Sequence, residues 1–454
     1  MATDREHFGS RFAAIAAMAG SAIGLGNIWR FPYMVGEYGG AAFIVIYILC
    51  SILISLPIFF CEAVIGRKAH LSTFDALSKL APGTAWKWLG TVAVAASFII
   101  VSYYCVVGGW SVDYLVRSFA GSLNAGTQAA TSALFGKVAT SVWEPLIAFT
   151  VFLGISAVIV VLGVHNGIEK FAKVCMPLLF VLIVAIMVYS LTLPGSEAGV
   201  RYLAKPDFSR ITPRSFSYAM GQSFFSLSLG VGCVLTYASY MKKEESLLSV
   251  GAWTLTFDTF FAIVAGFAVM PAVFSACIEP GAGPSLVFET LPFIFSSMAE
   301  SAPVLSYIVT VLFFVTILVA AFTSSISMLE VCVSFLMERT GLSRGKSSVI
   351  VFTSSWILGV LCSLSFGVLG GVKLFGLTIF NFCDTLTSNY LMTLGALVFA
   401  LFVGWKLDRS SVREELLRGC SGRGAEVVFS VLYFLVKWIV PFAILAIFLT
   451  NLFV

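Results

Sequence analysis

Long apolar runs alternate with short polar segments along the whole chain. A helix needs about 20 mostly apolar residues to cross a hydrocarbon core about 30 Å thick, because each residue adds about 1.5 Å. Eleven runs meet this requirement, at residues 11–36, 41–66, 88–116, 143–163, 169–192, 216–240, 249–275, 305–337, 348–368, 374–404 and 428–453. The pattern predicts an all-α polytopic membrane protein with about 11 transmembrane helices, in a single domain over residues 1–454.

Composition supports the lipid bilayer as the first partner. Charged residues make up 11% of the 454 residues and hydrophobic residues 59%, whereas about 25% of a soluble domain is charged. This excludes a soluble enzyme and a disordered protein. The net charge of +4 is small and spread over short loops, so no nucleic-acid partner is expected.

The distribution of Lys and Arg predicts the orientation, because positively charged loops stay on the cytoplasmic side. With the N-terminus inside, eighteen of the 27 Lys and Arg residues fall in inner segments and eight in outer ones. We therefore expect a multi-pass protein of the inner (plasma) membrane, with a cytoplasmic N-terminus and an external C-terminus.

Two predicted spans are interrupted by glycine clusters, at Gly20–Asn27 in the first and Ser226–Gly232 in the sixth. Each contains a Gly-x-Gly segment, and the two spans are five apart. Either cluster alone could serve close helix packing. Their paired placement favours a five-plus-five inverted repeat with broken helices 1 and 6, dividing the chain into residues 11–192, residues 216–404 and an additional helix at 428–453.

Such breaks suit a zwitterion and a cation. N–H groups freed at a half-helix N-terminus attract a carboxylate, while freed carbonyls attract an ammonium group or a sodium ion. An amino acid carries both charges, so the broken spans predict a midplane site for one.

Ionisable residues within spans are candidates for function, since charge in a bilayer is costly. They are Arg30, Glu62, Asp258, Glu330 and Asp384. Glu62 and Glu330 lie near inner ends, where anchoring a loop or pairing with backbone is as reasonable as a role in transport. No HExxH or CxxC motif occurs, so neither an enzyme nor an organic cofactor is expected.

These segments resemble the neurotransmitter:sodium symporter family, in particular its bacterial amino-acid transporters of the LeuT type. The run from Gly20 to Pro32 carries the most specific similarity. The other matching segments are Arg5–Phe8, Glu62 with Gly66–Arg67, Tyr103–Tyr104, Gly167–Lys173 with Pro177, Gly221–Gly232, Tyr237–Tyr240 and Thr323–Ser325. The resemblance implies a LeuT-like fold and sodium-coupled transport.

The resemblance also implies a substrate site. The substrate carboxylate would meet the N–H groups of Leu25 and Gly26 and the Tyr104 hydroxyl, and the amine would meet carbonyls of the two breaks. The full set of implied substrate residues is Ala22, Gly24, Leu25, Gly26, Ile100, Tyr104, Phe225, Ser226, Ser228, Val231, Ser324 and Met328. Since the residues around the side chain are mostly apolar, a charged side chain would be unpaired, and we expect a neutral, hydrophobic L-amino acid.

Two sodium ions and two gates follow from the same resemblance. The first ion would use Ala22, Asn27, Ser226 and Thr254, and the second Gly20, Ile23, Ala320, Thr323 and Ser324. The outer gate would be Arg30 and Asp384 with Gln222, and the inner gate Arg5 and Glu338. Asp258 stands where animal members carry a neutral residue and need chloride, so we expect this carboxylate to replace the anion.

The sequence thus predicts a sodium-coupled symporter that imports a large aliphatic or aromatic L-amino acid by alternating access. A carrier of another small zwitterion, or a transporter-like substrate sensor, would share these features. An ion channel is less favoured because no filter segment is found, and an intramembrane enzyme is less favoured because no HExxH motif is found. The oligomeric state is left open.

Overall fold

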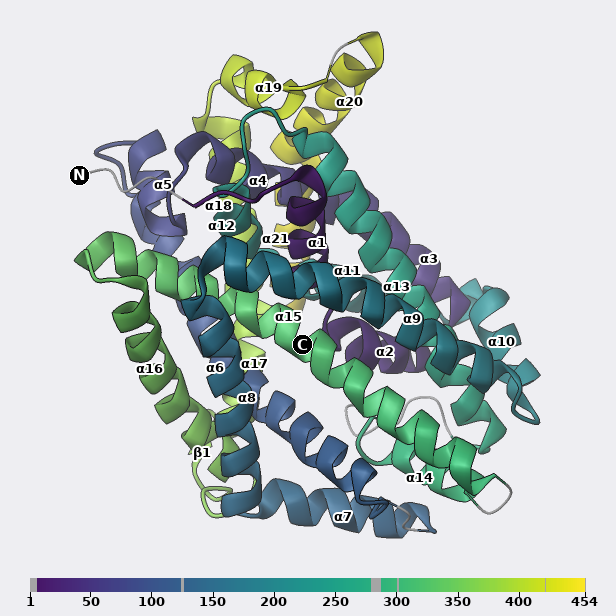
Figure 1. The fold of residues 1–454 in the computed structure, drawn as a ribbon. Coiled ribbons are helices and arrows are strands. Elements are labelled where there is room, and N and C mark those ends of the chain that lie inside the picture. Colours follow the sequence, from purple (N-terminus) through teal and green to yellow (C-terminus); the bar gives the residue numbers. More distant parts are fainter. Residues whose placement is uncertain (1–5, 124–125, 279–286, 300–301, 421, 454) are drawn as a thin grey trace.

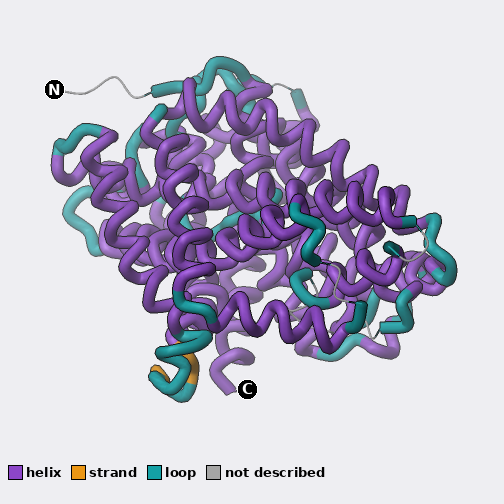
Figure 2. The backbone as a smooth tube through the Cα atoms, turned by 60° about the horizontal axis from the view of Figure 1, so that its bottom comes forward, coloured by secondary structure: helices purple, strands orange, loops and turns teal. Residues whose placement is uncertain are grey.

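The computed structural model describes residues 6–123, 126–278, 287–299, 302–420 and 422–453. Helices make up almost all of it (Figure 2). The first half contains α1 (Arg11–Ala22), η1 (Gly26–Arg30), α2 (Phe31–Tyr38), α3 (Ala41–Cys50), η2 (Ser51–Ser55), α4 (Leu56–Ala69), α5 (Thr73–Leu80), α6 (Trp86–Phe119), α7 (Gln128–Thr140), α8 (Trp143–Val161), η3 (Val164–Glu169) and α9 (Lys170–Leu191).

The second half repeats this helical character, with one short hairpin. Its helices are α10 (Ser196–Ala204), η4 (Phe208–Arg210), α11 (Pro213–Ser226), α12 (Cys233–Ala238), α13 (Leu247–Ser275), α14 (Thr290–Met298), α15 (Pro303–Thr340), α16 (Arg344–Leu364), α17 (Ile379–Thr385), η6 (Leu386–Leu391), α18 (Met392–Leu401), η7 (Phe402–Lys406), α19 (Arg409–Leu417), α20 (Arg423–Phe434), η8 (Leu435–Ile439) and α21 (Val440–Phe453). Strands β1 (Lys373–Leu374) and β2 (Leu377–Thr378) pair antiparallel.

The hairpin corrects one predicted boundary. The span expected at 374–404 begins as a helix only at Ile379, because Gly376 turns the chain with φ +84° between the two strands. The helix then runs to Lys406. An apolar run alone cannot distinguish a short strand pair from the first turn of a helix.

The predicted spans are helical. Within the described residues, nine continuous helices are long and apolar enough to cross a bilayer, and α1 with η1 and α2 forms a further pair bent by 48°. The remaining stretch, 216–240, forms α11 and α12, which are divided at residues 227–232 and are each too short to cross alone. The two discontinuities fall in the spans whose glycines predicted them.

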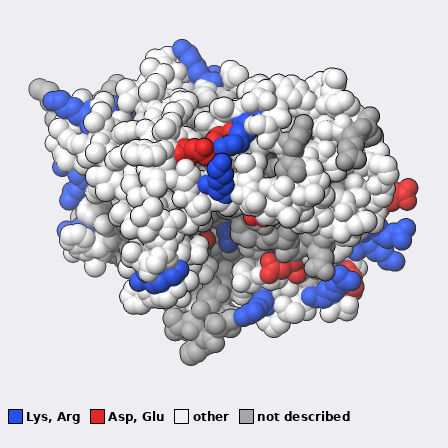
Figure 3. Space-filling model, turned by 90° about the horizontal axis from the view of Figure 1, so that it is seen from below, with Lys and Arg blue, Asp and Glu red and all other residues white. Residues whose placement is uncertain are grey.

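Short helices between the spans gather at the two ends of the bundle. Helices α5 and α19 lie at one end, near the beginning of α20, and α7, α14 and the hairpin lie at the other (Figure 1). Following the orientation that the Lys and Arg distribution predicts, we call these the inner and outer ends. Figure 3, which looks onto the outer end, shows scattered charges on a largely uncharged surface. Large apolar side chains such as Val181, 63% exposed, cover the flanks, as lipid contact requires.

Candidate functional site

The first span is broken beside a buried tyrosine. Helix α1 ends at Ala22, Ile23 is extended with ψ 103°, and η1 begins at Gly26. In the gap, the Leu25 N–H donates to the Tyr104 hydroxyl over 3.3 Å. Glycine is required at position 24, since a Cβ there would overlap Ser324 Oγ and lie 3.2 Å from the Tyr104 hydroxyl. Backbone and side-chain donors therefore converge on one point in the middle of the bundle.

The sixth span is broken at the same depth. Helix α11 ends at Ser226 and α12 begins at Cys233, and between them Ser228 adopts φ +52° and Gly230 φ +79°. The left-handed region is uncommon for a residue with a side chain, and such strain tends to occur at functional sites. The Ser228 hydroxyl donates to the Ser21 carbonyl over 2.9 Å, which joins the two breaks.

The carboxylate of Glu62 holds the sixth break from the neighbouring helix α4. Its two oxygens accept hydrogen bonds from the N–H groups of Gly230, at 2.7 Å, and Leu235, at 3.3 Å. The side chain is fully buried. Of the two roles that the sequence left open for Glu62, the structure shows pairing with backbone, and the backbone concerned is the broken span itself.

A small cavity lies between the two breaks. It measures about 30 Å³. It is lined by Met392 and by all of the predicted substrate residues except Leu25 and Ser226, namely Ala22, Gly24, Gly26, Ile100, Tyr104, Phe225, Ser228, Val231, Ser324 and Met328. Leu25 still faces this region through its N–H group. The cavity must widen to take a large side chain.

A buried polar cluster lies next to the cavity, among residues predicted for the first sodium ion. Asn27 Nδ2 donates to Ser226 Oγ at 3.0 Å and to Asp258 Oδ1 at 2.8 Å, and Ser226 Oγ donates to the same Asp258 oxygen at 2.7 Å. The Tyr47 hydroxyl donates to Asp258 Oδ2 at 3.2 Å. Thr254, one turn before Asp258 on α13, is buried, and its hydroxyl has no hydrogen-bond partner among the described residues.

The residues predicted for the second sodium ion also meet. Thr323 Oγ1 lies 3.1 Å from the Ile23 carbonyl oxygen and 2.8 Å from that of Ala320. Ser324 Oγ donates to the Ser21 carbonyl at 3.2 Å, and Gly20 faces Thr323, whose Cβ would lie 3.6 Å from a Cβ at that glycine. Carbonyl and hydroxyl oxygens of this kind suit a hard cation.

Two of the predicted outer gate residues, Arg30 and Gln222, contact residues that line the cavity. The Arg30 guanidinium lies 4.7 Å from the centre of the Phe225 ring, and Gln222 Nε2 donates to the Gly26 carbonyl at 2.9 Å. Asp384 accepts from the Tyr103 hydroxyl at 3.1 Å. Within the described part of the chain, no direct ion pair joins Arg30 to Asp384.

At the inner end, Glu338 accepts from the Ser72 N–H at 2.8 Å, and its predicted partner Arg5 lies outside the described residues. Partial burial and the nearby Glu338 charge raise the pKa of Asp75, against the opposing effect of Arg339. Glu330, the other carboxylate left open by the sequence, is buried and forms an ion pair with Arg344 at 2.7 Å.

Sequence reasoning missed two residues of the site. Tyr47 is the single tyrosine of the apolar run 41–66, and a hydroxyl in mid-span needs a partner, so it could have been singled out. Met392 left no signal, because one methionine among apolar neighbours does not indicate which side of a helix faces a cavity.

Comparisons with known proteins agree with this geometry. The family model described as "Sodium:neurotransmitter symporter family" matches residues 5–134 and 133–454. An uncharacterized sodium-dependent transporter of Bacillus subtilis, YhdH, is 38% identical over 97% of this chain and 96% of its own length. One from Haemophilus influenzae is 35% identical over 99% and 98%.

A solved structure shows the same fold. The crystal structure of MhsT in complex with L-phenylalanine has a TM-score of 0.90 and 39% sequence identity, covering 98% of this chain and 99% of the other. This similarity confirms the predicted fold class, a LeuT-like bundle.

Proposed function

The chain belongs to the sodium:neurotransmitter symporter family, and on that premise we propose that it imports a neutral, hydrophobic L-amino acid together with two sodium ions. It would act in the plasma membrane with its N-terminus in the cytoplasm. The observation that carries the proposal is the cavity, where an N–H group and a tyrosine hydroxyl face apolar side chains. An α-carboxylate matches the N–H group and the hydroxyl, and an uncharged substrate side chain matches the apolar side chains.

The bound phenylalanine of the MhsT structure supports the same substrate class. In this chain Ile100, Phe225, Val231 and Met328 supply apolar walls, and none of the described residues that line the cavity is Lys, Arg, Asp or Glu. A charged substrate side chain would therefore lose its hydration without gaining a partner.

Sodium would act by linkage. If an ion completes the carboxylate site, sodium and substrate strengthen each other's binding by the same factor. A sodium gradient then drives loading from outside and release inside, as one group of helices rocks against the other about the midplane site.

The test of this function is uptake by purified protein in liposomes under an inward sodium gradient, with all twenty amino acids as competitors. We expect leucine-like and aromatic amino acids to compete, and charged ones to fail. Uptake that ignores sodium, or competition only by charged amino acids, contradicts the proposal. Tight sodium-dependent binding without accumulation would identify a sensor instead.

Replacing Asn27 with alanine should weaken sodium and substrate binding together. Asn27 bonds to Ser226 and Asp258 and accepts from the Gly24 N–H at 3.0 Å, so its loss disturbs both the ion cluster and the first break. We expect each apparent affinity to fall by about tenfold, because a lost buried hydrogen bond costs about 1–3 kcal/mol. Equilibrium binding of a labelled amino acid across a sodium titration measures both. Asn389→Ala, at an exposed position, is the matched control.

Replacing Met392 with alanine should shift selectivity toward larger substrates. Met392 lines the cavity from α18 and is 3% exposed, and truncation would leave room that only a longer side chain fills. We expect the preference for tryptophan over valine to rise by about tenfold, in the range that pocket methylenes give. Met270→Ala, buried but remote from the cavity, should leave the preference unchanged. An unaltered ratio in Met392→Ala would exclude this residue from the substrate pocket.

A further inference from the structure

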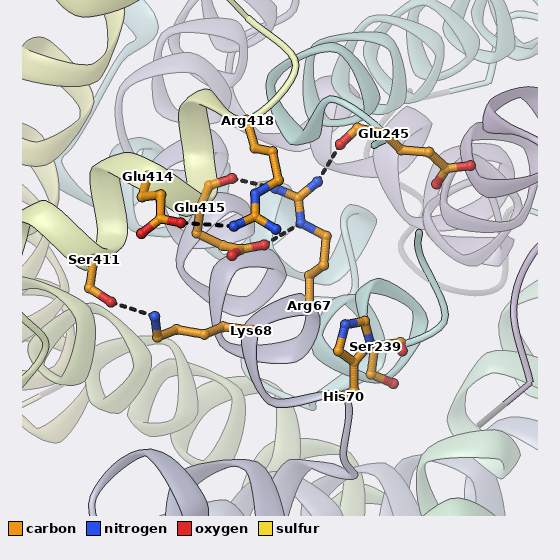
Figure 4. Close-up of polar contacts among 9 residues, drawn as sticks. All are labelled: Arg67, Lys68, His70, Ser239, Glu245, Ser411, Glu414, Glu415 and Arg418. Atoms are coloured by element: carbon orange, nitrogen blue, oxygen red, sulfur yellow. Dashed lines mark hydrogen bonds and ion pairs between the residues drawn. The ribbon is translucent and has the colours of Figure 1, made fainter. Parts of the chain in front are cut away.

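A buried arginine at the inner end of α4 connects three segments that are distant in sequence. Arg67 Nε donates to Glu415 Oε1 at 2.5 Å. Its two terminal nitrogens donate to backbone carbonyls, one of Glu245 and one of Glu415 (Figure 4). Glu245 precedes α13, and Glu415 lies on α19. We call this arrangement the Arg67 clasp.

Neighbouring contacts strengthen the same junction. Lys68 donates to Ser411 on α19 (Figure 4), and Ser246, which caps α13, lies 3.0 Å from the sulfur of Cys420. Residues on both sides of the clasp therefore tie α19 and the residues after it to α4 and α13, and α19 packs on both of those helices.

We propose that the Arg67 clasp makes α19 travel with α4 and α13 as one body during transport, so that α19 acts as a strap that positions the inner ends of the helices holding the broken spans. This inference rests on the proposed transport function. It concerns a helix that the sequence left among the loops, and it assigns a role to Arg67 and Glu415.

The burial of the Arg67 clasp indicates that Arg67 and Glu415 remain in contact throughout transport. The Arg67 side chain is 0% exposed and that of Glu415 8% exposed. Separating a buried ion pair leaves an uncompensated charge out of contact with water, which is strongly unfavourable. Since α19 also buries Val412, Leu416 and Leu417, moving it away from α4 in every cycle would expose apolar surface as well.

The clasp is also coupled to the site through helices that begin or end at it. Arg67 follows Glu62 by five residues on α4, about 7.5 Å along a helix, and Glu62 holds the Gly230 and Leu235 N–H groups. Helix α13, which starts next to Ser246, carries Asp258. If α19 fixes the inner ends of α4 and α13 relative to each other, Glu62 and Asp258 keep their positions beside the two breaks.

Reversible cross-linking tests whether α19 moves with α4. The starting protein carries Cys277→Ser and Cys420→Ser, since these cysteines are not buried. Lys68→Cys with Ser411→Cys then allows a short bifunctional thiol reagent to join α4 to α19. The comparison pair is Glu6→Cys with Arg344→Cys, whose native side chains approach to 3.6 Å and which joins the N-terminal segment to α16. Because Arg344 also pairs with the buried Glu330, uptake by the reduced form of this pair is its baseline.

We expect the α4–α19 cross-link to leave at least about half of sodium-driven uptake, and the Glu6–Arg344 cross-link to lower it about tenfold, with recovery on reduction. Loss of uptake on joining α4 to α19, restored by reductant, would overturn the proposal, because it would mean that the two helices separate in each cycle.

Point variants supply an independent test. Glu415→Gln removes the charge facing Arg67, and we expect uptake to fall about tenfold and amide exchange in α19 to rise. Glu414→Gln is the matched control, since the adjacent Glu414 side chain is 69% exposed. Equal uptake and equal exchange in the two variants would contradict a role for the clasp.

The sodium-dependent change in hydrogen exchange at residues 66–80 and 235–250, measured on the same cross-linked samples, separates this proposal from the substrate assignment. If no amino acid is taken up by the starting protein, the proposed substrate class fails. The sodium-dependent change in hydrogen exchange then still tests whether α19 moves with α4. If this change persists after α4 is joined to α19, it supports the proposal, and if it is lost, the proposal is overturned.

Discussion

Replacing Glu62 with alanine is expected to lower sodium-driven uptake by about a hundredfold, because two buried backbone N–H groups would lose their acceptor at a cost of about 1–3 kcal/mol each. These groups belong to Gly230 and Leu235, on either side of the start of α12. Water cannot easily replace the carboxylate, since Glu62 is fully buried. The sixth break should then lose the geometry that the proposed site needs.

Uptake in liposomes, together with a thermal unfolding scan in detergent, measures this effect. Glu62→Gln should retain part of the activity, because its amide oxygen can accept one hydrogen bond while its NH₂ group faces a donor. Glu197→Ala, at an exposed position on α10, controls for loss of a carboxylate alone. Full activity in Glu62→Ala would show that the sixth break keeps its geometry without the Glu62 carboxylate.

The broken spans could be predicted from the sequence because their cause is local. Gly20–Asn27 and Ser226–Gly232 place glycine and hydroxyl residues where an uninterrupted helix would carry apolar side chains, and backbone freed within a membrane must line a protected site. The same reasoning singled out Asp258, whose charge in mid-span required partners that the structure supplies from Asn27 and Ser226.

What lay beyond the sequence depends on contacts between distant segments. Met392 lines the cavity only because α18 packs against the sixth break, where the Met392 carbonyl lies against Gly230. In the sequence, Glu415 is one of several carboxylates in a polar segment, and its pairing with Arg67 depends on the packing of α19 on α4. Periodicity cannot indicate the position of Met392, because a helix that is apolar on all faces, such as α18, carries no mark of which face turns inward.

The second large effect concerns Asp258, whose replacement by serine is expected to make uptake depend on chloride. In the folded protein this buried carboxylate accepts hydrogen bonds from Asn27, Ser226 and Tyr47, so it supplies a fixed negative charge beside the predicted first sodium ion. Serine removes that charge but leaves the same donors around a vacated space. An anion can then satisfy them and balance the sodium.

The measurement compares uptake with chloride and with gluconate as the anion. Uptake by the wild type should differ by less than about twofold between the two anions. Uptake by Asp258→Ser should fall at least about tenfold in gluconate and recover mostly in chloride, since one unpaired buried charge costs more than about 1.4 kcal/mol. Asp258→Asn fills the space without charge and should stay impaired in both salts. A wild type that loses most of its uptake in gluconate would refute the assignment, because an anion would then be needed despite the carboxylate already in place.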